Sequence, residues 1–243
     1  MPVNEAELLA AVSSLPLLRK AKPAQKVEVF CKKLKFCCIV CDFKNDKVEI
    51  RLKQTKRQIL TELIDFVDVT RGVLTDTSYN LSTQMFAINI FRPIYQKEMT
   101  IDFMEEENLS DRKEWVHLQL VYSYFIKMLD CSEFQANKAK KFFTHEFITR
   151  LIQMFAVEDV QEREYLKTIL HRIYAKFLGM RAFTRKQISD KILEVAFENM
   201  SVPGLCEILE VMGSIINGYM RPYKAEHVTF LQQVKAALKE AND

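Results

Sequence analysis

The chain has 243 residues, a formal net charge of +3 at pH 7, 49% hydrophobic and 28% charged residues, and only five glycines and six prolines. This composition is typical of a well-packed helical protein and excludes a disordered chain, and the small net charge gives no support to nucleic-acid binding. The first residues lack the pattern of a secretory signal peptide, and no uncharged run approaches the roughly 18 residues that a membrane span needs. We therefore expect a cytoplasmic or nuclear protein that binds no membrane.

Helical periodicity recurs along the chain, whereas the alternation typical of strands is not sustained anywhere. Turn residues separate the periodic segments, among them Pro23, Gly72, Pro93, Gly179 and Pro203. The predicted helices lie at residues 4–19, 24–42, 51–70, 78–92, 110–130, 138–156, 159–179, 184–199, 203–219 and 225–240.

Helices of this length, joined by short turns, give roughly one pair per 40 to 50 residues, which is the spacing of HEAT-type repeats. No strict internal repeat is visible, so the repeats are degenerate. We predict an all-α fold, a curved α-solenoid of about ten helices in HEAT-like pairs. It forms a single domain over residues 1–243, in which residues 1–23 are an N-terminal helix and linker and residues 24–243 are the repeats.

Four of the six cysteines fall within one predicted helix, namely Cys31, Cys37, Cys38 and Cys41. The Cys38–Cys41 spacing is compatible with zinc or redox chemistry, but a structural zinc site needs a second ligand pair, and the sequence offers none nearby. Cysteine is a small buried residue in most intracellular helices. We therefore favour core packing with reduced thiols and predict no metal site.

An acidic connection, Glu98–Asn108, joins two of the predicted helices. Its carboxylates would suit a metal ion or a basic partner, but such a run is more often a solvated loop, which is the interpretation we favour.

No catalytic constellation is present: the sequence has no glycine-rich phosphate loop, no histidine pair at metal-ligand spacing and no nucleophile beside a histidine in a recognisable motif. Four histidines are scattered along the chain. We interpret His117 as a core residue, and we interpret the basic run Lys138–Lys141 before His145 as a solvated helix face. The protein is therefore predicted not to be an enzyme and to take no cofactor.

The segment Leu166–Ile188 carries the most information. Its first part predicts a helix whose core stripe consists of Leu166, Ile169, Leu170, Ile173 and Phe177. Other side chains fall away from this stripe, namely His171, Tyr174 and Leu178, with Thr168 beside them and Arg172 and Arg181 on the flanks. Such a second face is either covered by another helix or holds a ligand, and spacing alone favours the covered face.

A later helix offers a second wall for a groove. Its predicted core stripe consists of Leu205, Ile208, Leu209, Met212, Ile216 and Tyr219. Val211 and Ile215 lie at the edge of this stripe beside Glu207, Glu210 and Ser214, and Lys224 and His227 follow the helix. Periodicity alone assigns Val211 and Ile215 to the core, although the edge of a solenoid helix can open onto a concave groove.

Four segments in order resemble the B-prime family of regulatory subunits of protein phosphatase type 2A, namely Cys37–Phe43, Trp115–Tyr122, Leu166–Ile188 and Leu209–Gly218. The resemblance runs from about Val27 to about Phe230. It implies a non-catalytic adaptor that binds the short linear motif LxxIxE, often with acidic or phosphorylated flanks, in a concave groove. The matching groove positions are Thr168, His171, Arg172, Tyr174, Leu178, Arg181, Glu210, Val211, Ile215, Lys224 and His227.

The resemblance also implies roles for these residues. The first apolar pocket has Arg172, Lys224 and His227 at its floor, and the pocket for the motif's isoleucine is formed by Tyr174, Val211 and Ile215. His171 and Arg181 face the acidic groups of the peptide, which suit charge-assisted hydrogen bonds. The implied partners are motif-bearing proteins together with the scaffold and catalytic subunits of the phosphatase.

The sequence departs from the family pattern in three places. Val211 stands where isoleucine is usual, and Arg221–Tyr223 replaces a more apolar Leu-Pro-Leu. The family's later repeats, which help to engage the catalytic subunit, do not follow residue 243. We therefore expect either a fragment or a short form capped by its polar last helix, with weakened engagement of the catalytic subunit. The alternative function is a structural assembly protein that self-associates or holds a scaffold, through this end or through the surface around Arg221–Tyr223.

Overall fold

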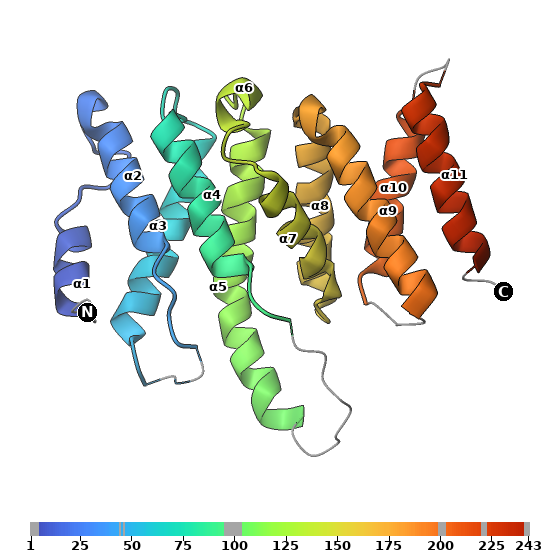
Figure 1. Cartoon of the computed structure of the whole chain (residues 1–243). Helices are drawn as coiled ribbons and strands as arrows, with labels where there is room; N and C mark the ends of the chain where they lie inside the picture. Colours follow the sequence, from blue (N-terminus) through green and yellow to red (C-terminus); the bar gives the residue numbers. More distant parts are fainter. Residues whose placement is uncertain are drawn as a thin grey trace. The chain divides into compact units, whose positions relative to one another are not determined.

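A computed structural model of the chain describes residues 5–43, 45, 47–94, 104–198, 203–219 and 223–240, and every regular element in this part is helical (Figure 1). The α-helices are α1 (Glu5–Ser13), α2 (Lys26–Cys37), α3 (Ile50–Val67), α4 (Asp76–Ile90), α5 (Met104–Asp130), α6 (Ala136–Ala139), α7 (His145–Gln153), α8 (Val160–Lys176), α9 (Arg181–Glu198), α10 (Leu205–Asn217) and α11 (Ala225–Glu240). Short 3₁₀ turns lie at η1 (Pro23–Gln25), η3 (Met154–Ala156) and η4 (Leu178–Met180). Among the described residues, no helix is long and apolar enough to cross a membrane.

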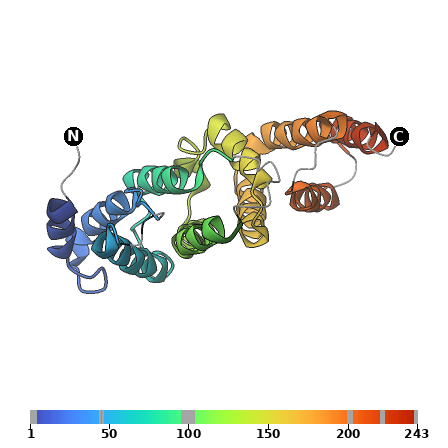
Figure 2. The same cartoon turned by 90° about the horizontal axis from the view of Figure 1, so that it is seen from below.

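The chain divides into two compact units, unit 1 (Met1–Phe142) and unit 2 (Phe143–Asp243). In unit 1, α2 packs beside α4 in one layer and α3 packs beside α5 in the other. The two layers contact each other through the pairs α2–α3 and α4–α5 (Figure 2). In unit 2, α7, α9 and α11 follow one another in one layer, while α8 packs beside α10 in the other. The predicted all-α fold of stacked helix pairs is confirmed within each unit, and the assignment of 1–243 as a single domain stays a prediction.

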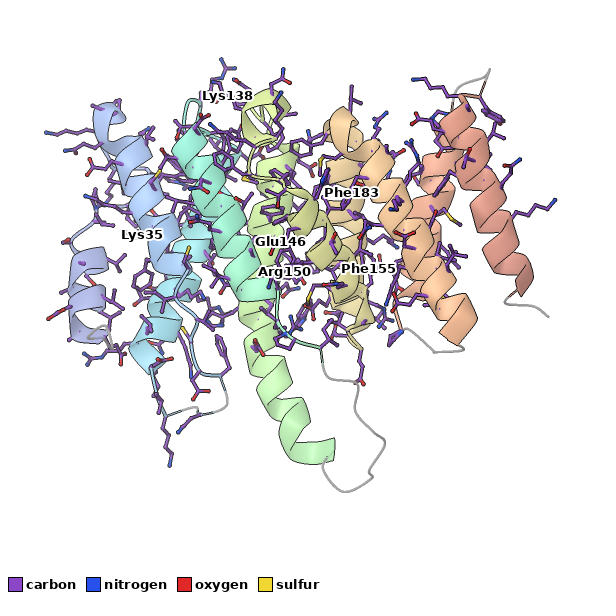
Figure 3. All side chains as sticks on the ribbon, in the orientation of Figure 1. Lys35, Lys138, Glu146, Arg150, Phe155 and Phe183 are labelled. Atoms are coloured by element: carbon purple, nitrogen blue, oxygen red, sulfur yellow. The ribbon has the colours of Figure 1, made fainter. Side chains whose placement is uncertain are left out.

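The predicted helix at 138–156 is wrong, because the chain is interrupted before α7. The Thr144 side chain accepts a hydrogen bond from the Phe147 N–H at 3.2 Å and so caps the start of α7. The basic run Lys138–Lys141 therefore lies on the short α6 and the turn after it rather than along one long helix (Lys138 is labelled in Figure 3). Lys141 pairs with Asp76 at 2.5 Å.

Other boundaries also differ from the prediction; α1, for example, ends at Ser13 rather than at residue 19. The acidic connection is already helical from Met104, where α5 begins, and residues 98–103 lie outside the described residues. Helix α2 ends at Cys37, so Cys38 and Cys41 follow it rather than lying within it. Helix ends of this kind are set by local hydrogen bonds, which periodicity does not report.

Core packing is predicted for all four cysteines of this region: Cys37 and Cys41 are buried, whereas Cys31 and Cys38 are half-buried. Burial raises the pKa of the Cys37 thiol to about 12, so the thiol is protonated and inert. All six cysteines of the chain are free, and the described residues contain no group of three or more side chains arranged to hold a metal ion.

A buried lysine fixes the segment after α2. The Lys56 ammonium of α3 donates to the Ile39 carbonyl and to the Asn89 side-chain oxygen, both at 2.6 Å, and burial lowers its pKa. His117 of α5 is also buried, with its Nε2 3.0 Å from the Lys53 carbonyl oxygen and its ring 4.7 Å from the Phe43 ring. The interpretation of His117 as a core residue is therefore confirmed.

Gly204, directly before α10, is expected to be the least replaceable glycine of unit 2. A Cβ at this position would overlap the carbonyl oxygen of Phe155 (labelled in Figure 3) and lie 2.8 Å from the Phe155 Cβ. The substitution Gly204→Ala should lower the free energy of unfolding by about 2–3 kcal/mol through overpacking. Gly213→Ala, inside α10 with nothing within 4 Å, should raise it by about 1 kcal/mol. Urea unfolding that ranked the two variants the other way would contradict this packing.

Candidate functional site

All eleven predicted groove residues lie in unit 2, on or beside α8, η4, α9, α10 and α11. Helix α8 begins after Asp159, whose side chain accepts a hydrogen bond from the Glu162 N–H at 2.8 Å. Its predicted core stripe is correct, since Leu166, Ile169, Leu170, Ile173 and Phe177 are all buried. This stripe holds α8 in the unit and fixes the directions of its remaining side chains.

Helix α8 ends at Lys176, because Phe177 leaves the helical region with φ −108° and ψ 82°. The chain then turns through η4, and Arg181 opens α9 and folds back onto α8. Its Nε donates to the Tyr174 carbonyl oxygen at 3.0 Å, and its guanidinium carbon lies 5.2 Å from the centre of the Tyr174 ring. Arg181 therefore satisfies a free carbonyl at the end of α8 and makes a cation–π contact with Tyr174.

A second arginine, Arg185, lies one turn further along α9 and is only 5% exposed. One of its terminal nitrogens donates to the Tyr174 hydroxyl at 3.0 Å, and the other lies 2.8 Å from the Glu226 carboxylate on α11. Glu226 in turn lies 3.6 Å from the His227 Nε2. The His227 ring stacks on Tyr219 with ring centres 3.9 Å apart and planes only 4° from parallel. This network, which we call the Arg185 network, links α8, α9 and α11.

The sequence interpretation missed three members of this network, Arg185, Tyr219 and Glu226. Arg185 follows Arg181 by four residues, so both lie on the same face of α9, and this spacing could have identified it. Tyr219 was assigned only to a core stripe. Burial raises the pKa of its hydroxyl to about 12, so Tyr219 stays neutral beside His227.

Three polar contacts tie α8 to α10, and each spans 43 or 44 residues of sequence. The His171 Nε2 lies 2.9 Å from the Ser214 hydroxyl, and the Lys167 ammonium lies 2.6 Å from the Glu210 carboxylate. At the buried end, Arg163 Nε donates to Glu207 at 2.7 Å. The constant separation agrees with the predicted repeat of one helix pair per roughly 40 to 50 residues.

The buried Arg163–Glu207 pair also explains why the predicted core stripe of α10 is partly wrong. Glu207 faces inward toward Arg163, which rotates the buried face of the helix. Val211 and Ile215 are consequently only 2% and 4% exposed, whereas Leu205, Leu209, Ile216 and Tyr219 are half-buried. Periodicity cannot place an inward-facing glutamate, because the compensating arginine belongs to another helix.

The other predicted groove residues differ widely in exposure. Tyr174 is 9% exposed, so it belongs largely to the core. Leu178 is not on α8 but on η4, where it is 68% exposed. Thr168 and Arg172 are half-buried and Lys224 is exposed. Within the described part of unit 2, no hydrogen bond or ion pair joins the side chains of Thr168, Leu178 or Lys224 to the Arg185 network.

The arrangement suits binding rather than catalysis. Exposed or half-buried cationic and imidazole groups are present: His171 and Arg172 lie on α8, Arg181 at the start of α9, and Lys224 directly before α11. Guanidinium groups bind carboxylates and phosphates in bidentate geometry, which favours an acidic peptide as the ligand. The residues Met220, Arg221 and Pro222, and with them most of the predicted surface at Arg221–Tyr223, lie outside the described residues.

Comparison with known proteins places the chain in a family. The human 56 kDa regulatory subunit alpha isoform of serine/threonine-protein phosphatase 2A is 40% identical over 225 residues, which cover 93% of this chain and 46% of that protein. The delta isoform of Oryctolagus cuniculus is 39% identical over 227 residues, which cover 92% of this chain and 39% of that protein. The beta isoform of Mus musculus is 40% identical over 231 residues, which cover 95% of this chain and 46% of that protein.

The chain thus spans less than half the length of these relatives. Residues 15–242 match the family described as "Protein phosphatase 2A regulatory B subunit (B56 family)", which is the B-prime family of the resemblance. The match covers nearly the whole chain and confirms that resemblance. This protein belongs to the B56 family of protein phosphatase 2A regulatory B subunits.

Proposed function

We propose that the chain is a non-catalytic regulatory module that binds LxxIxE-type linear motifs between α8, α10 and the start of α11. Membership of the B56 family supports the regulatory role. The observation that carries the motif-binding role is the contact of Tyr174 with Arg181 and Arg185, beside His171 on the same helix. Cationic, imidazole and aromatic groups from successive helices are thereby held close together in unit 2.

The burial of the apolar groove residues fits a preformed site. Tyr174, Val211 and Ile215 each have less than a tenth of their surface exposed, so each is already packed in the unit. In this proposal the isoleucine of the motif covers the remaining edges of these side chains. Side chains that are already packed lose little conformational entropy on binding.

The polar part of the motif has partners of the right charge. His171 and Arg181 are accessible to the acidic groups of the peptide, and Lys224 is exposed directly before α11. Acidic or phosphorylated flanks should strengthen binding, and added salt should reduce that gain, because exposed charges are screened within about 10 Å at moderate ionic strength.

The names of the relatives suggest the wider assembly. They are regulatory subunits of protein phosphatase 2A, and we propose that this chain likewise joins scaffold and catalytic subunits and brings motif-bearing proteins to them. Co-purification of the full chain with both subunits tests this part, and a chain that binds motif peptides but neither subunit would contradict it.

Titration calorimetry with a short LxxIxE peptide tests the motif-binding role. A short peptide buries less than a standard protein interface, so the dissociation constant should be roughly micromolar, which corresponds to a binding free energy of about −8 kcal/mol. Two control peptides, with the isoleucine or the glutamate of the motif replaced by alanine, should bind at least about tenfold more weakly, a difference of roughly 1.4 kcal/mol each. The absence of binding by the unmodified peptide, or equal binding of all three, would refute the proposal.

A further inference from the structure

The Arg185 network contains a buried charge with two different partners. The Arg185 guanidinium, 5% exposed, divides its donors between the neutral Tyr174 hydroxyl and the Glu226 carboxylate. A guanidinium has a rigid planar shape, so its two contacts fix each other in direction. The position of the Tyr174 hydroxyl therefore depends on where Glu226 holds the guanidinium.

Glu226 extends this dependence to a second groove residue. Its other carboxylate oxygen lies 3.6 Å from the His227 Nε2, and His227 is held flat against Tyr219. Tyr174 and His227 come from α8 and α11, and the described contacts connect them through the Arg185–Glu226 pair.

We infer that Arg185 and Glu226 are positioning residues of the peptide site, which set the relative placement of Tyr174 and His227 before any ligand arrives. This inference rests on the proposed function. Neither residue has to touch the peptide. The pair acts through Tyr174, which faces the isoleucine of the motif, so its effect on affinity is specific to that part of the ligand.

An ion pair with one buried member could also serve only to stabilise the fold, so the test has to separate that role from positioning of the peptide site. The test variant is Glu226→Gln, which removes the charge at nearly constant volume. The matched control is Glu194→Gln on α9, because Glu194 pairs with Lys191 at 2.8 Å, the same distance as the Arg185–Glu226 pair. The side chains of Glu226 and Glu194 are also equally exposed, at 49% each.

Calorimetry with two peptides gives the decisive comparison. Glu226→Gln should lower the affinity for the LxxIxE peptide about tenfold. It should lower the affinity for the isoleucine-to-alanine peptide no more than about twofold, because the lost positioning matters only where Tyr174 meets the isoleucine. Glu194→Gln should leave both affinities unchanged. Arg185→Met should reduce binding of the LxxIxE peptide at least as much as Glu226→Gln, and Arg185→Lys should restore part of the loss.

Equal weakening of both peptides by Glu226→Gln would mean that the pair only stabilises the fold, and no weakening would overturn the inference as well. Hydrogen–deuterium exchange without peptide provides a second readout: amides in the first turns of α11 should exchange faster in Glu226→Gln than in Glu194→Gln. Unchanged exchange would show that the pair positions nothing. If the wild type binds neither peptide but exchange responds, the proposed function fails while the coupling within the network stands.

Discussion

Replacing Arg172 with alanine is expected to weaken binding of an LxxIxE peptide about thirtyfold or more. Arg172 lies on α8 next to His171 and is half-buried, so a ligand that covers it removes water from its charge. Loss of one desolvated charged partner costs about 2 kcal/mol or more, which is thirtyfold in affinity. Titration calorimetry on the full chain measures the change.

Lys186→Ala is the matched control for Arg172→Ala. Lys186 is an exposed cation of α9 that is not among the groove residues, so its removal makes the same change in net charge. Its effect should be small at moderate salt, because exposed charges at a distance are screened. Equal losses for the two variants would mean that the peptide responds to overall charge, and undiminished binding by Arg172→Ala would remove Arg172 from the site.

The structure also changes how Tyr174 should be tested. Replacing Tyr174 with alanine, alone or together with His171→Ala, would not report on peptide binding alone. Tyr174 is largely buried and accepts a hydrogen bond from Arg185, so its truncation leaves a cavity and removes one of the two partners of the buried guanidinium. Truncation of a buried aromatic residue costs about 3–5 kcal/mol. Tyr174→Phe, which keeps the ring, is the variant that isolates the hydroxyl.

The second large effect is expected at the buried pair Arg163–Glu207, which joins α8 to α10. Arg163 also donates to the Val157 and Glu158 carbonyl oxygens at 3.0 and 2.7 Å. Arg163→Met should lower the free energy of unfolding by about 3–5 kcal/mol, because it leaves the Glu207 carboxylate buried without a counterion. Urea unfolding followed by circular dichroism measures the loss.

A double substitution provides the control for this pair. Adding Glu207→Leu to Arg163→Met removes the stranded carboxylate, so the double variant should be clearly more stable than Arg163→Met alone. Lys191→Met, which breaks the more exposed pair with Glu194, should cost less than about 1 kcal/mol. A double variant no more stable than the single one would show that the carbonyl contacts of Arg163, rather than its charge, support α8.

The sequence by itself determined the helical fold and the repeat. Apolar spacing identified the buried stripe of α8 completely, and it placed α11 at residues 225–240, where the structure has it. It also predicted a repeat of the right length, which the contacts between α8 and α10 show as a separation of 43 or 44 residues. These features depend on local backbone preference and on the period of the apolar residues, and both can be read along one helix.

Only the tertiary structure decided which side chains cover Tyr174 and why Glu207 of α10 faces the core. Periodicity placed Tyr174 away from the core stripe of α8 and favoured a covered face there, and only the structure shows that Arg181 and Arg185 of α9 cover it. Periodicity alone assigned Val211 and Ile215 to the core, although at the edge of the predicted stripe, and both are buried on the face where Glu207 pairs with Arg163. In each case the deciding partner is a charged side chain on another helix, and a buried charge is tolerated only where such a partner exists. That condition depends on the packing of several helices at once, so no pattern within a single segment reveals it.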